Sequence, residues 1–356
     1  MKVPEQIFSG VFSQGHVQGI AVDEERGFVY YSFTTVFVKT DFAGRRIGTV
    51  HNLIGHLGCI TYERETDRVY GSLELKHDAI GSSIEKHTGK KLSEENAFYL
   101  VSFDVGAIDR DGMDAEKDGV MKAVWLSDVV RDYTDVDEVS GNKHRYGCSG
   151  IDGIALAPAF GAGKESDPKI LVAYGIYGDV ARNDNDHQVI LQYDRSVVER
   201  YGRPLEQTAP HHNGPERAER KLFFRTGNTV YGIQNLEYDP ASERVFLAVY
   251  RGKKPGFANY PMYVIDRTVA PVTEELIGRN GERGDLLTAA RTPVSDPGHP
   301  EIYGCTFPYG QTGMAALGDG RFCFSVPETD PVNRRFSSTV TLFRYRPDDP
   351  DLFVRA

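Results

Sequence analysis

Cysteine, tryptophan and long apolar runs are scarce in this chain of 356 residues. Its four cysteines lie in or beside expected strands without the paired spacing of a disulfide framework: Cys59, Cys148, Cys305 and Cys323. This pattern predicts buried free thiols and a reducing, cytoplasmic setting. No apolar run has the length of a membrane-spanning helix, and the N-terminal residues lack a signal-peptide core. We therefore expect neither an integral membrane protein nor a disulfide-rich secreted one.

Positive charge is in deficit as well. The chain has 41 Lys and Arg residues against 51 Asp and Glu residues, which gives a net charge of −10. Such a balance weighs against nucleic acid or an anionic membrane surface as the main partner. The expected partner is a small molecule or an oligosaccharide, and the oligomeric state stays open.

A short motif of glycine, polar and apolar residues is repeated along the chain. Its copies begin at Gly15, Gly55, Gly150, Gly232 and Gln311. Each copy is a polar turn that leads into a short apolar strand, usually followed by an acidic turn and a second strand. Repeats of this kind predict an all-β fold, a five-bladed β-propeller with four-stranded blades. The intervals between the later copies are long enough to contain further blades, so six or seven blades is the alternative.

Turn residues and alternating apolar positions set the expected strand boundaries. The clearest strands are 20–23, 27–33, 36–41 and 46–50 in the first blade, 170–174, 188–193 and 221–225 in the third, 245–250 and 262–266 in the fourth, and 321–325, 339–345 and 352–355 in the fifth. We expect residues 1–356 to form a single domain with excursions at about 80–96 and 201–220. Residues 6–12 have no blade of their own, so we expect them to pair with the C-terminal strands and close the ring.

Acidic residues cluster in the segment 109–119. Asp109, Asp111 and Asp114 are candidate calcium ligands by type. Their spacing does not match the EF-hand pattern, so we expect a solvated loop.

Polar side chains gather on one face of the expected propeller. The turns before the innermost strands and the loops between second and third strands open on the same face, and they carry His, Tyr, Arg and amide residues. Such a mouth is the expected binding site. The candidate substrate-binding residues are Gln18, Arg145, Asp152, Tyr231, Gln234, Arg251, Tyr309 and Gln311.

Two histidines occupy the same position in neighbouring copies of the motif. His16 and His56 should both approach the central axis, and His77 follows in a nearby loop. A neutral imidazole serves as a metal ligand or as an acid–base group near pH 7. The three histidines are therefore candidate catalytic residues and, as the alternative, candidate ligands of a divalent metal ion.

A further group of residues fits proton removal beside a carboxylate. Elimination at a uronate needs a base, a cation that stabilises the enolate and an acid for the leaving oxygen. One of the three histidines would be the base, Arg182 or Arg251 the cation, and Tyr146 or Tyr177 the acid. Lys253 and Lys254 add positive charge near Arg251, which favours a small anionic substrate.

At the level of blade pattern, the chain resembles the five-bladed propellers that include many carbohydrate-active enzymes. Glycosidases of that architecture place Asp or Glu at the start of inner strands, where this chain has His16 and His56; only Asp152 lies near such a place. The mouth is similar to that of propeller-type polysaccharide lyases. The resemblance implies a carbohydrate-active enzyme that cleaves a small uronate-containing oligosaccharide by β-elimination. Metal-dependent hydrolysis of a glycoside or lactone and non-catalytic ligand binding are the alternatives.

Overall fold

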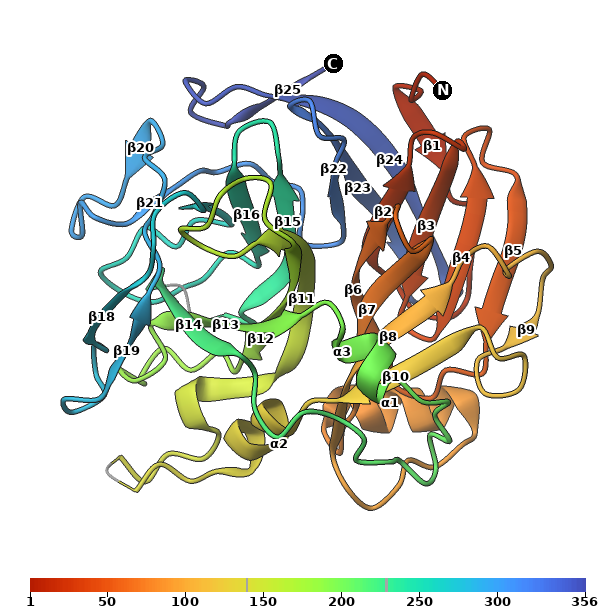
Figure 1. Ribbon diagram of the computed structural model, residues 1–356, viewed down its shortest axis with the longest axis horizontal. Helices are drawn as coiled ribbons and strands as arrows, with labels where there is room; N and C mark the ends of the chain where they lie inside the picture. Colours follow the sequence, from red (N-terminus) through yellow and green to blue (C-terminus); the bar gives the residue numbers. More distant parts are fainter. Residues whose placement is uncertain (139, 228–229) are drawn as a thin grey trace.

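Five β-sheets are arranged around a central axis in the computed structural model, which describes residues 1–138, 140–227 and 230–356 (Figure 1). The innermost strands contact one another in a closed order: β2 with β6, β6 with β11, β11 with β15, β15 with β22, and β22 with β2. This order closes after five members. The five-bladed propeller expected from the repeated motif is therefore confirmed.

The first two blades come from the N-terminal third of the chain. Blade one contains β2 (Val17–Asp23), β3 (Phe28–Phe33), β4 (Val36–Asp41), β5 (Arg46–His51) and the short β9 (Met113–Asp114). Blade two contains β6 (His56–Glu63), β7 (Arg68–Leu75), β8 (Ala97–Asp104) and β10 (Met121–Trp125). The acidic segment expected as a solvated loop thus contributes β9, which pairs in parallel with β5.

The next two blades differ in size. Blade three contains β11 (Cys148–Pro158), β12 (Pro168–Ile176), β13 (His187–Asp194), β14 (Arg220–Arg225), β19 (Arg283–Leu286) and β18 (Val272–Glu275). Blade four contains β15 (Ile233–Asp239), β16 (Arg244–Val249) and β17 (Met262–Asp266), and β20 (Val294–Ser295) pairs separately with β21 (Tyr303–Gly304). The expectation of four strands is wrong for blade four. Within the described residues, the outer side of β17 forms only isolated bridges, with Ala289 and Cys305, and no fourth strand.

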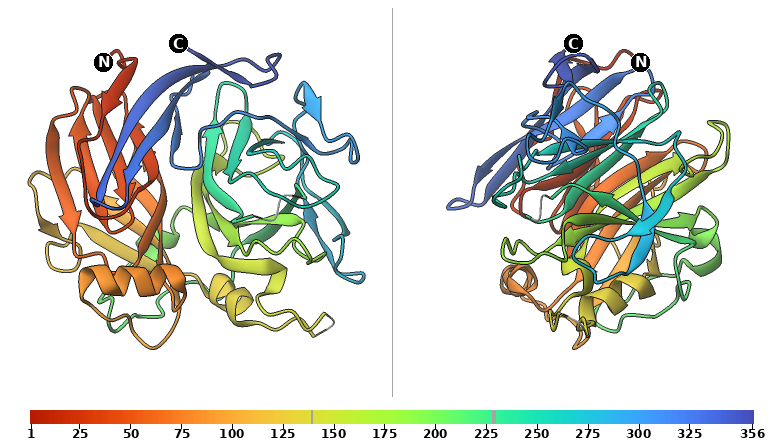
Figure 2. Two further views of the ribbon diagram at one scale, coloured as in Figure 1. Left: turned by 180° about the vertical axis from the view of Figure 1, so that it is seen from behind. Right: turned by 90° about the vertical axis from the view of Figure 1, so that its left-hand side faces the viewer.

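The last blade joins the two ends of the chain. It contains β22 (Met314–Ala316), β23 (Arg321–Asp330), β24 (Arg335–Tyr345), β25 (Phe353–Arg355) and the N-terminal β1 (Gln6–Phe8). Strand β1 pairs antiparallel with β24, where Gln6 lies opposite Thr341. Both termini consequently lie on the same side of the molecule (Figure 2). The expected contribution of the N-terminal segment to the C-terminal sheet is thus observed.

Helices occur in the connections. They are α1 (Ala79–Thr88), α2 (Ser127–Thr134), η1 (Arg145–Gly147) and α3 (Val197–Tyr201). Helix α1 lies in the excursion between β7 and β8; the Asp78 carboxylate caps its N-terminus, and Gly89 ends it in a left-handed conformation. Helices α1 and α2 lie on the same side of the ring (Figure 1). Because they follow the mouth-side ends of β7 and β10, they build up the rim of the mouth.

The excursion at 201–220 lies against blade two. Arg203 forms a bridge with Ala123, and the Asn213 carbonyl accepts a hydrogen bond from the Trp125 amide. The side chain of Gln207 is fully buried and contacts the backbone of Asn52 and Ile54. This segment therefore covers the outer part of blade two, although its proline and histidine content indicated only a polar excursion.

Four of the innermost strands carry a β-bulge near the mouth. Register shifts occur between Val17 and Gly19 in β2, Leu57 and Ile60 in β6, Ile151 and Ile154 in β11, and Ile233 and Asn235 in β15. A bulge re-aims the side chains beside it. Polar residues at the mouth can therefore face the axis while the rest of each strand alternates normally.

Serines at one position of the second strand tie neighbouring blades together. The Ser32 hydroxyl donates to the Gly58 carbonyl at 2.6 Å, and the Ser72 hydroxyl donates to the Asp152 carbonyl at 3.0 Å. Each bond links one blade to the innermost strand of the next. The repeated motif thus encodes a contact between blades as well as the strands themselves.

Ser32→Ala should lower the free energy of unfolding by about 1–2 kcal/mol, because the buried Gly58 carbonyl would lose its donor. Urea unfolding followed by circular dichroism measures this change. Ser82→Ala, on the exposed side of α1, is the matched control and should change stability by less than about 0.5 kcal/mol. Equal effects of the two substitutions would contradict the prediction.

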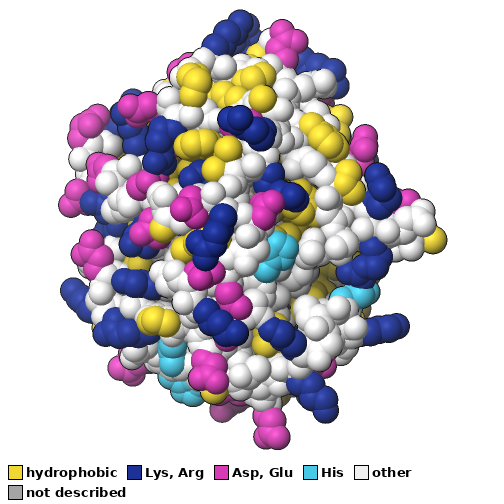
Figure 3. All heavy atoms as spheres, turned by 90° about the vertical axis from the view of Figure 1, so that its right-hand side faces the viewer, with side chains coloured by type: hydrophobic (Ala, Val, Ile, Leu, Met, Phe, Trp, Pro, Cys, Tyr) yellow, Lys and Arg dark blue, Asp and Glu magenta, His cyan; other side chains and the backbone are white. Residues whose placement is uncertain are grey.

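The interior is apolar and aromatic, and all four cysteines are buried and free, as expected. Lys and Arg are interspersed with Asp and Glu on the face seen in Figure 3. Within the described residues, no helix is long and apolar enough to cross a membrane.

Candidate functional site

A histidine and two carboxylates meet at the mouth end of the innermost strands. His56 begins β6 and pairs in register with Glu74 near the end of β7. Asp152 lies in the bulged part of β11. One potential ligand atom from each of the three residues lies within 4.8 Å of the other two. This group, His56, Glu74 and Asp152, is called the axial cluster below.

The His56 Nδ1 atom is buried at the centre of the axial cluster. It lies 3.6 Å from Glu74 Oε2 and 3.7 Å from Asp152 Oδ1. Both distances are too long for hydrogen bonds, and Nδ1 has no hydrogen-bond partner among the described residues. Two ligands bound at about 2.1 Å to one ion lie roughly 3–4 Å apart. The spacing therefore suits a bound cation better than direct contact.

Glu74 is fixed from two sides. Its Oε1 accepts the Ile151 amide, and its Oε2 lies 2.8 Å from the buried ammonium of Lys76. Lys76 also donates to the Ser149 carbonyl at 2.8 Å and lies 3.3 Å from Asp78 Oδ2. These contacts hold the carboxylate toward His56.

Glycine at position 150 leaves room for this arrangement. Gly150 has a φ of +126°, and a β-carbon there would lie 1.9 Å from Glu74 Oε1. A larger residue would displace a carboxylate that is held at both oxygens. The motif copy that begins at Gly150 therefore serves the site as well as the strand.

Burial dominates the electrostatics of the axial cluster. It lowers the pKa of His56 to about 3, with the charge of Lys76 acting in the same direction. It raises the pKa of Glu74, and burial together with the charge of Glu74 raises the pKa of Asp152 well above its usual value. Burial alone would lower the pKa of Lys76, but Glu74 and Asp78 outweigh it and raise that pKa. The imidazole is neutral, as a metal ligand must be.

The charges of the site leave a surplus that matches a divalent ion. Glu74, Asp78 and Asp152 supply three negative charges when ionised, and Lys76 supplies one positive charge, which leaves two negative charges. A bound cation would reverse the upward pKa shifts of the carboxyl groups. Imidazole nitrogen with carboxylate oxygens is a donor set that suits zinc and similar divalent metals.

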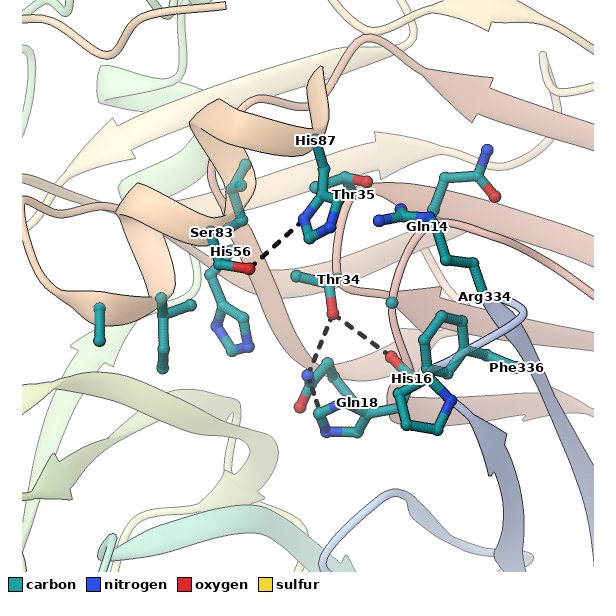
Figure 4. Close-up of a pocket in the computed structure, with 15 residues that line it drawn as sticks. Gln14, His16, Gln18, Thr34, Thr35, His56, Ser83, His87, Arg334 and Phe336 are labelled. Carbon is teal, nitrogen blue, oxygen red and sulfur yellow. Dashed lines mark hydrogen bonds between the residues drawn. The ribbon is translucent and has the colours of Figure 1, made fainter. Parts of the chain in front are cut away.

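A cavity of about 440 Å³ adjoins His56. Its walls come from the start of β2, from α1 and from the β23–β24 hairpin. Figure 4 shows His16, Gln18 and Thr34 together on one wall; the Gln18 amide donates to His16 Nε2 at 3.1 Å and to Thr34 Oγ1 at 3.3 Å. Burial lowers the pKa of His16. His16 and His56, which sequence analysis predicted to share the mouth, therefore line one cavity.

His77 does not join the other two histidines. Its side chain is exposed after β7, and its Nε2 lies 2.6 Å from the Ser93 carbonyl oxygen in the same excursion. The predicted metal set of His16, His56 and His77 is thus not brought together. The structure groups His56 with Glu74 and Asp152 instead, because alternation along β7 turns Glu74 inward and the residues after the strand leave the axis.

Arg182 and Tyr146, two of the residues predicted to assist elimination, lie in a separate charged network. Arg182 binds Asp184 and the carbonyls of Lys143 and His144. The Tyr146 hydroxyl and Arg145 both contact Glu282. These partners satisfy the hydrogen-bonding groups of both arginines and of the buried tyrosine. We therefore interpret the network as one that stabilises the loops of blade three.

The remaining predicted residues are divided between the mouth and its surroundings. Gln234 donates to Asp152 Oδ2 at 3.2 Å, and Gln311 supplies a carbonyl to Asn235. Tyr177 packs against His144, and exposed Tyr231 packs against Tyr250. Arg251 lines a different cavity with Asp296, and Tyr309 packs against Phe307 and Phe343. Gln234 therefore contacts the axial cluster directly.

Comparison with known proteins finds similarity in shape only. No protein-family model and no curated protein sequence matches the chain. A soluble aldose sugar dehydrogenase from Escherichia coli, in its apo form, aligns over 94% of this chain and 98% of its own, with 7% identity and a TM-score of 0.42. An exo-1,5-alpha-L-arabinanase from a bovine ruminal metagenomic library aligns over 96% and 97%, with 13% identity and a TM-score of 0.43. Hydrazine synthase from Kuenenia stuttgartiensis aligns over 93% and 84%, with 12% identity and a TM-score of 0.38.

Proposed function

We propose that the protein is a metal-assisted hydrolase of a small carbohydrate, a glycoside or a lactone. The observation that carries this proposal is the axial cluster. In it a buried His56 Nδ1, which has no hydrogen-bond partner in the part of the chain that the structure describes, faces two carboxylates beside a cavity. A divalent ion held there would polarise a carbonyl or glycosidic oxygen and activate water. His56 is the residue of the axial cluster that lines this cavity, and Asp152 keeps 17% of its side chain exposed.

The cavity wall suits a sugar. His16, Gln18 and Thr34 offer hydrogen-bonding groups, and Phe336 and Ile84 offer apolar surface. A sugar ring presents hydroxyls at its edge and carbon–hydrogen groups on its faces, so it can use both kinds of wall. A cavity of this size with a few converging polar groups is typical of a small-molecule site.

Elimination remains the rival reaction. In that reaction a cation must lie beside the uronate carboxylate at the reacting carbon. Of the two arginines expected in this role, Arg182 is paired with Asp184, and Arg251 lines a different cavity. We favour hydrolysis because the donor set of the axial cluster suits a divalent ion that would activate water.

Metal analysis and sugar turnover test the proposal. Protein stripped with a chelator and reloaded should bind about one equivalent of a divalent metal, and His56→Ala should reduce the bound metal at least tenfold. His77→Ala is the matched control and should bind metal normally, because its ring lies on the exposed loop. Metal below a tenth of an equivalent in the wild-type protein would refute the site.

The reaction itself is tested with a panel of oligosaccharides. Hydrolysis should produce new reducing ends or opened lactones without new near-ultraviolet absorbance. An unsaturated uronate that absorbs there would establish elimination instead. Binding at several equivalent sites without turnover would indicate a non-catalytic binding protein.

A further inference from the structure

A second cavity adjoins the cavity beside His56. A neighbouring cavity of about 290 Å³ shares four lining residues with it: Gln14, Thr35, His87 and Arg334. His56 lines only the first cavity, whereas Lys90 lines only the second. The two adjoining cavities, called the trough below, thus have His56 in the wall of one and Lys90 in the wall of the other.

No Asp or Glu lines either cavity of the trough in the part of the chain that the structure describes. The wall carries Arg334, Lys90 and the histidines His16, His51, His56 and His87. This is unusual for a chain with ten more acidic than basic residues. Three further cavities each include at least one carboxylate in their walls, Asp296, Glu274 and Asp194 among them.

The two cations of the trough are held by neutral groups. Arg334 donates to the Ser13 carbonyl at 2.6 Å, and the Lys90 ammonium contacts the Asn52 side-chain oxygen. The partners that the described residues give to both cations are therefore uncharged. In Figure 4 the Arg334 side chain extends from the β23–β24 hairpin toward Thr35. The guanidinium therefore keeps donors available to a ligand in the trough.

We propose that the trough binds a carbohydrate carrying an oxyanion, and that Arg334 and Lys90 bind this group. The proposal deepens the proposed function, on which it rests for the carbohydrate itself. A guanidinium presents two parallel N–H groups that match the oxygens of a carboxylate or a phosphate. Lys90 lines only the cavity that His56 does not reach, and Arg334 lies on the wall that the two cavities share. An acidic group bound by both cations would therefore lie on the side of the trough away from His56.

This placement of the acidic group differs from the one that elimination at a uronate requires. In elimination the carboxylate belongs to the sugar that reacts. Here the anion belongs to a more distant part of the ligand and contributes binding energy and orientation. Binding energy from a remote group is a recognised source of both affinity and specificity.

Isothermal titration calorimetry tests the inference with three probes: digalacturonate, glucose 6-phosphate and the neutral disaccharide maltose. Either acidic sugar should bind at least tenfold more tightly than maltose, and the stronger of the two identifies the oxyanion as carboxylate or phosphate. Arg334→Gln should weaken binding of that sugar roughly tenfold to a hundredfold, as expected for loss of a charge-assisted hydrogen bond, and leave maltose unchanged. Arg335→Gln removes the same charge at the next, exposed residue and should have no effect.

The measurement separates this inference from the proposed function, since binding is followed with and without added zinc. The protein could prefer acidic sugars but neither bind metal nor hydrolyse a carbohydrate. That result would contradict only the proposed function. Equal affinity for acidic and neutral sugars, no binding of either acidic sugar at millimolar concentration, or an unchanged Arg334→Gln would overturn the inference. Circular dichroism of each variant confirms that it is folded.

Discussion

Glu74→Ala is expected to lower the free energy of unfolding by about 3–5 kcal/mol, as is typical when one partner of a buried ion pair is removed. Lys76 would keep its charge in a buried position, with only Asp78 and the Ser149 carbonyl as partners. The Ile151 amide would also lose its acceptor. Chemical denaturation of the metal-free variant measures the loss.

Two further variants separate these causes. Glu74→Gln keeps an acceptor for Ile151 but removes the charge, so it isolates the contribution of the ion pair with Lys76. The double variant Glu74→Ala/Lys76→Met should recover part of the stability, because no unpaired ammonium remains. If Glu74→Ala cost less than about 1 kcal/mol, the buried pair could not have the role assigned to it here.

Acidification from pH 7 to pH 5 should cost the wild-type protein about 2 kcal/mol more stability than His56→Gln. The pKa of His56 is about 3 in the folded protein and about 6.5 in the unfolded chain. Below pH 6.5 the His56 imidazole binds a proton in the unfolded chain but stays neutral in the folded protein. The stability that depends on neutral His56 is therefore present above pH 6.5 and is lost progressively as the pH falls toward 3.

Urea unfolding at both pH values, with a chelator present, measures this difference. His187 has a pKa lowered to about 4 by burial, but it is present in both proteins and its contribution cancels. The raised pKa values of Glu74 and Asp152 act in the opposite sense, because protonation favours the folded state. Identical pH dependence in the two proteins would mean that His56 is solvated or already paired in the folded state.

The repeated motif predicted the innermost strands well. Copies beginning at Gly15 and Gly55 lead directly into β2 and β6, and residues 36–41 match β4 at both ends. These elements are local, since a glycine turn and an alternating apolar strand suffice to define them. The three-stranded fourth blade was missed because the outer edge of β17 meets residues about 25 and 40 positions away. Long-range pairing of this kind leaves no local signal.

The site was predicted less completely than the fold. His16 and His56 were placed at the mouth because they precede inner strands, and Asp152 was recognised for the same reason. Glu74 and Lys76 alternate with Leu73 and Leu75 on a second strand, a pattern that ordinarily indicates a solvated face. The structure instead buries both charged side chains against blade three. Two opposite charges at the mouth end of an otherwise apolar strand were the available signal.

Arg334 could not have been assigned from its surroundings in the sequence. It belongs to the turn between β23 and β24, where charged residues are common and usually solvated. Its neighbours in the trough, Gln14 and His87, come from the first and second blades. Only closure of the ring brings these three parts of the chain together.

The pairing of β1 with β24 has a consequence for synthesis of the protein in the cell. The ribosome makes Gln6 long before Thr341, its partner, which lies 335 residues further along the chain. Until then the fifth blade lacks β24, which links β1 to β23. All strands of blades one to four precede β24 in the chain, so they can form before it is made, but β1 keeps an unpaired edge until then. Ring closure is therefore a late, non-local step, and the Arg334 side of the trough forms only with it.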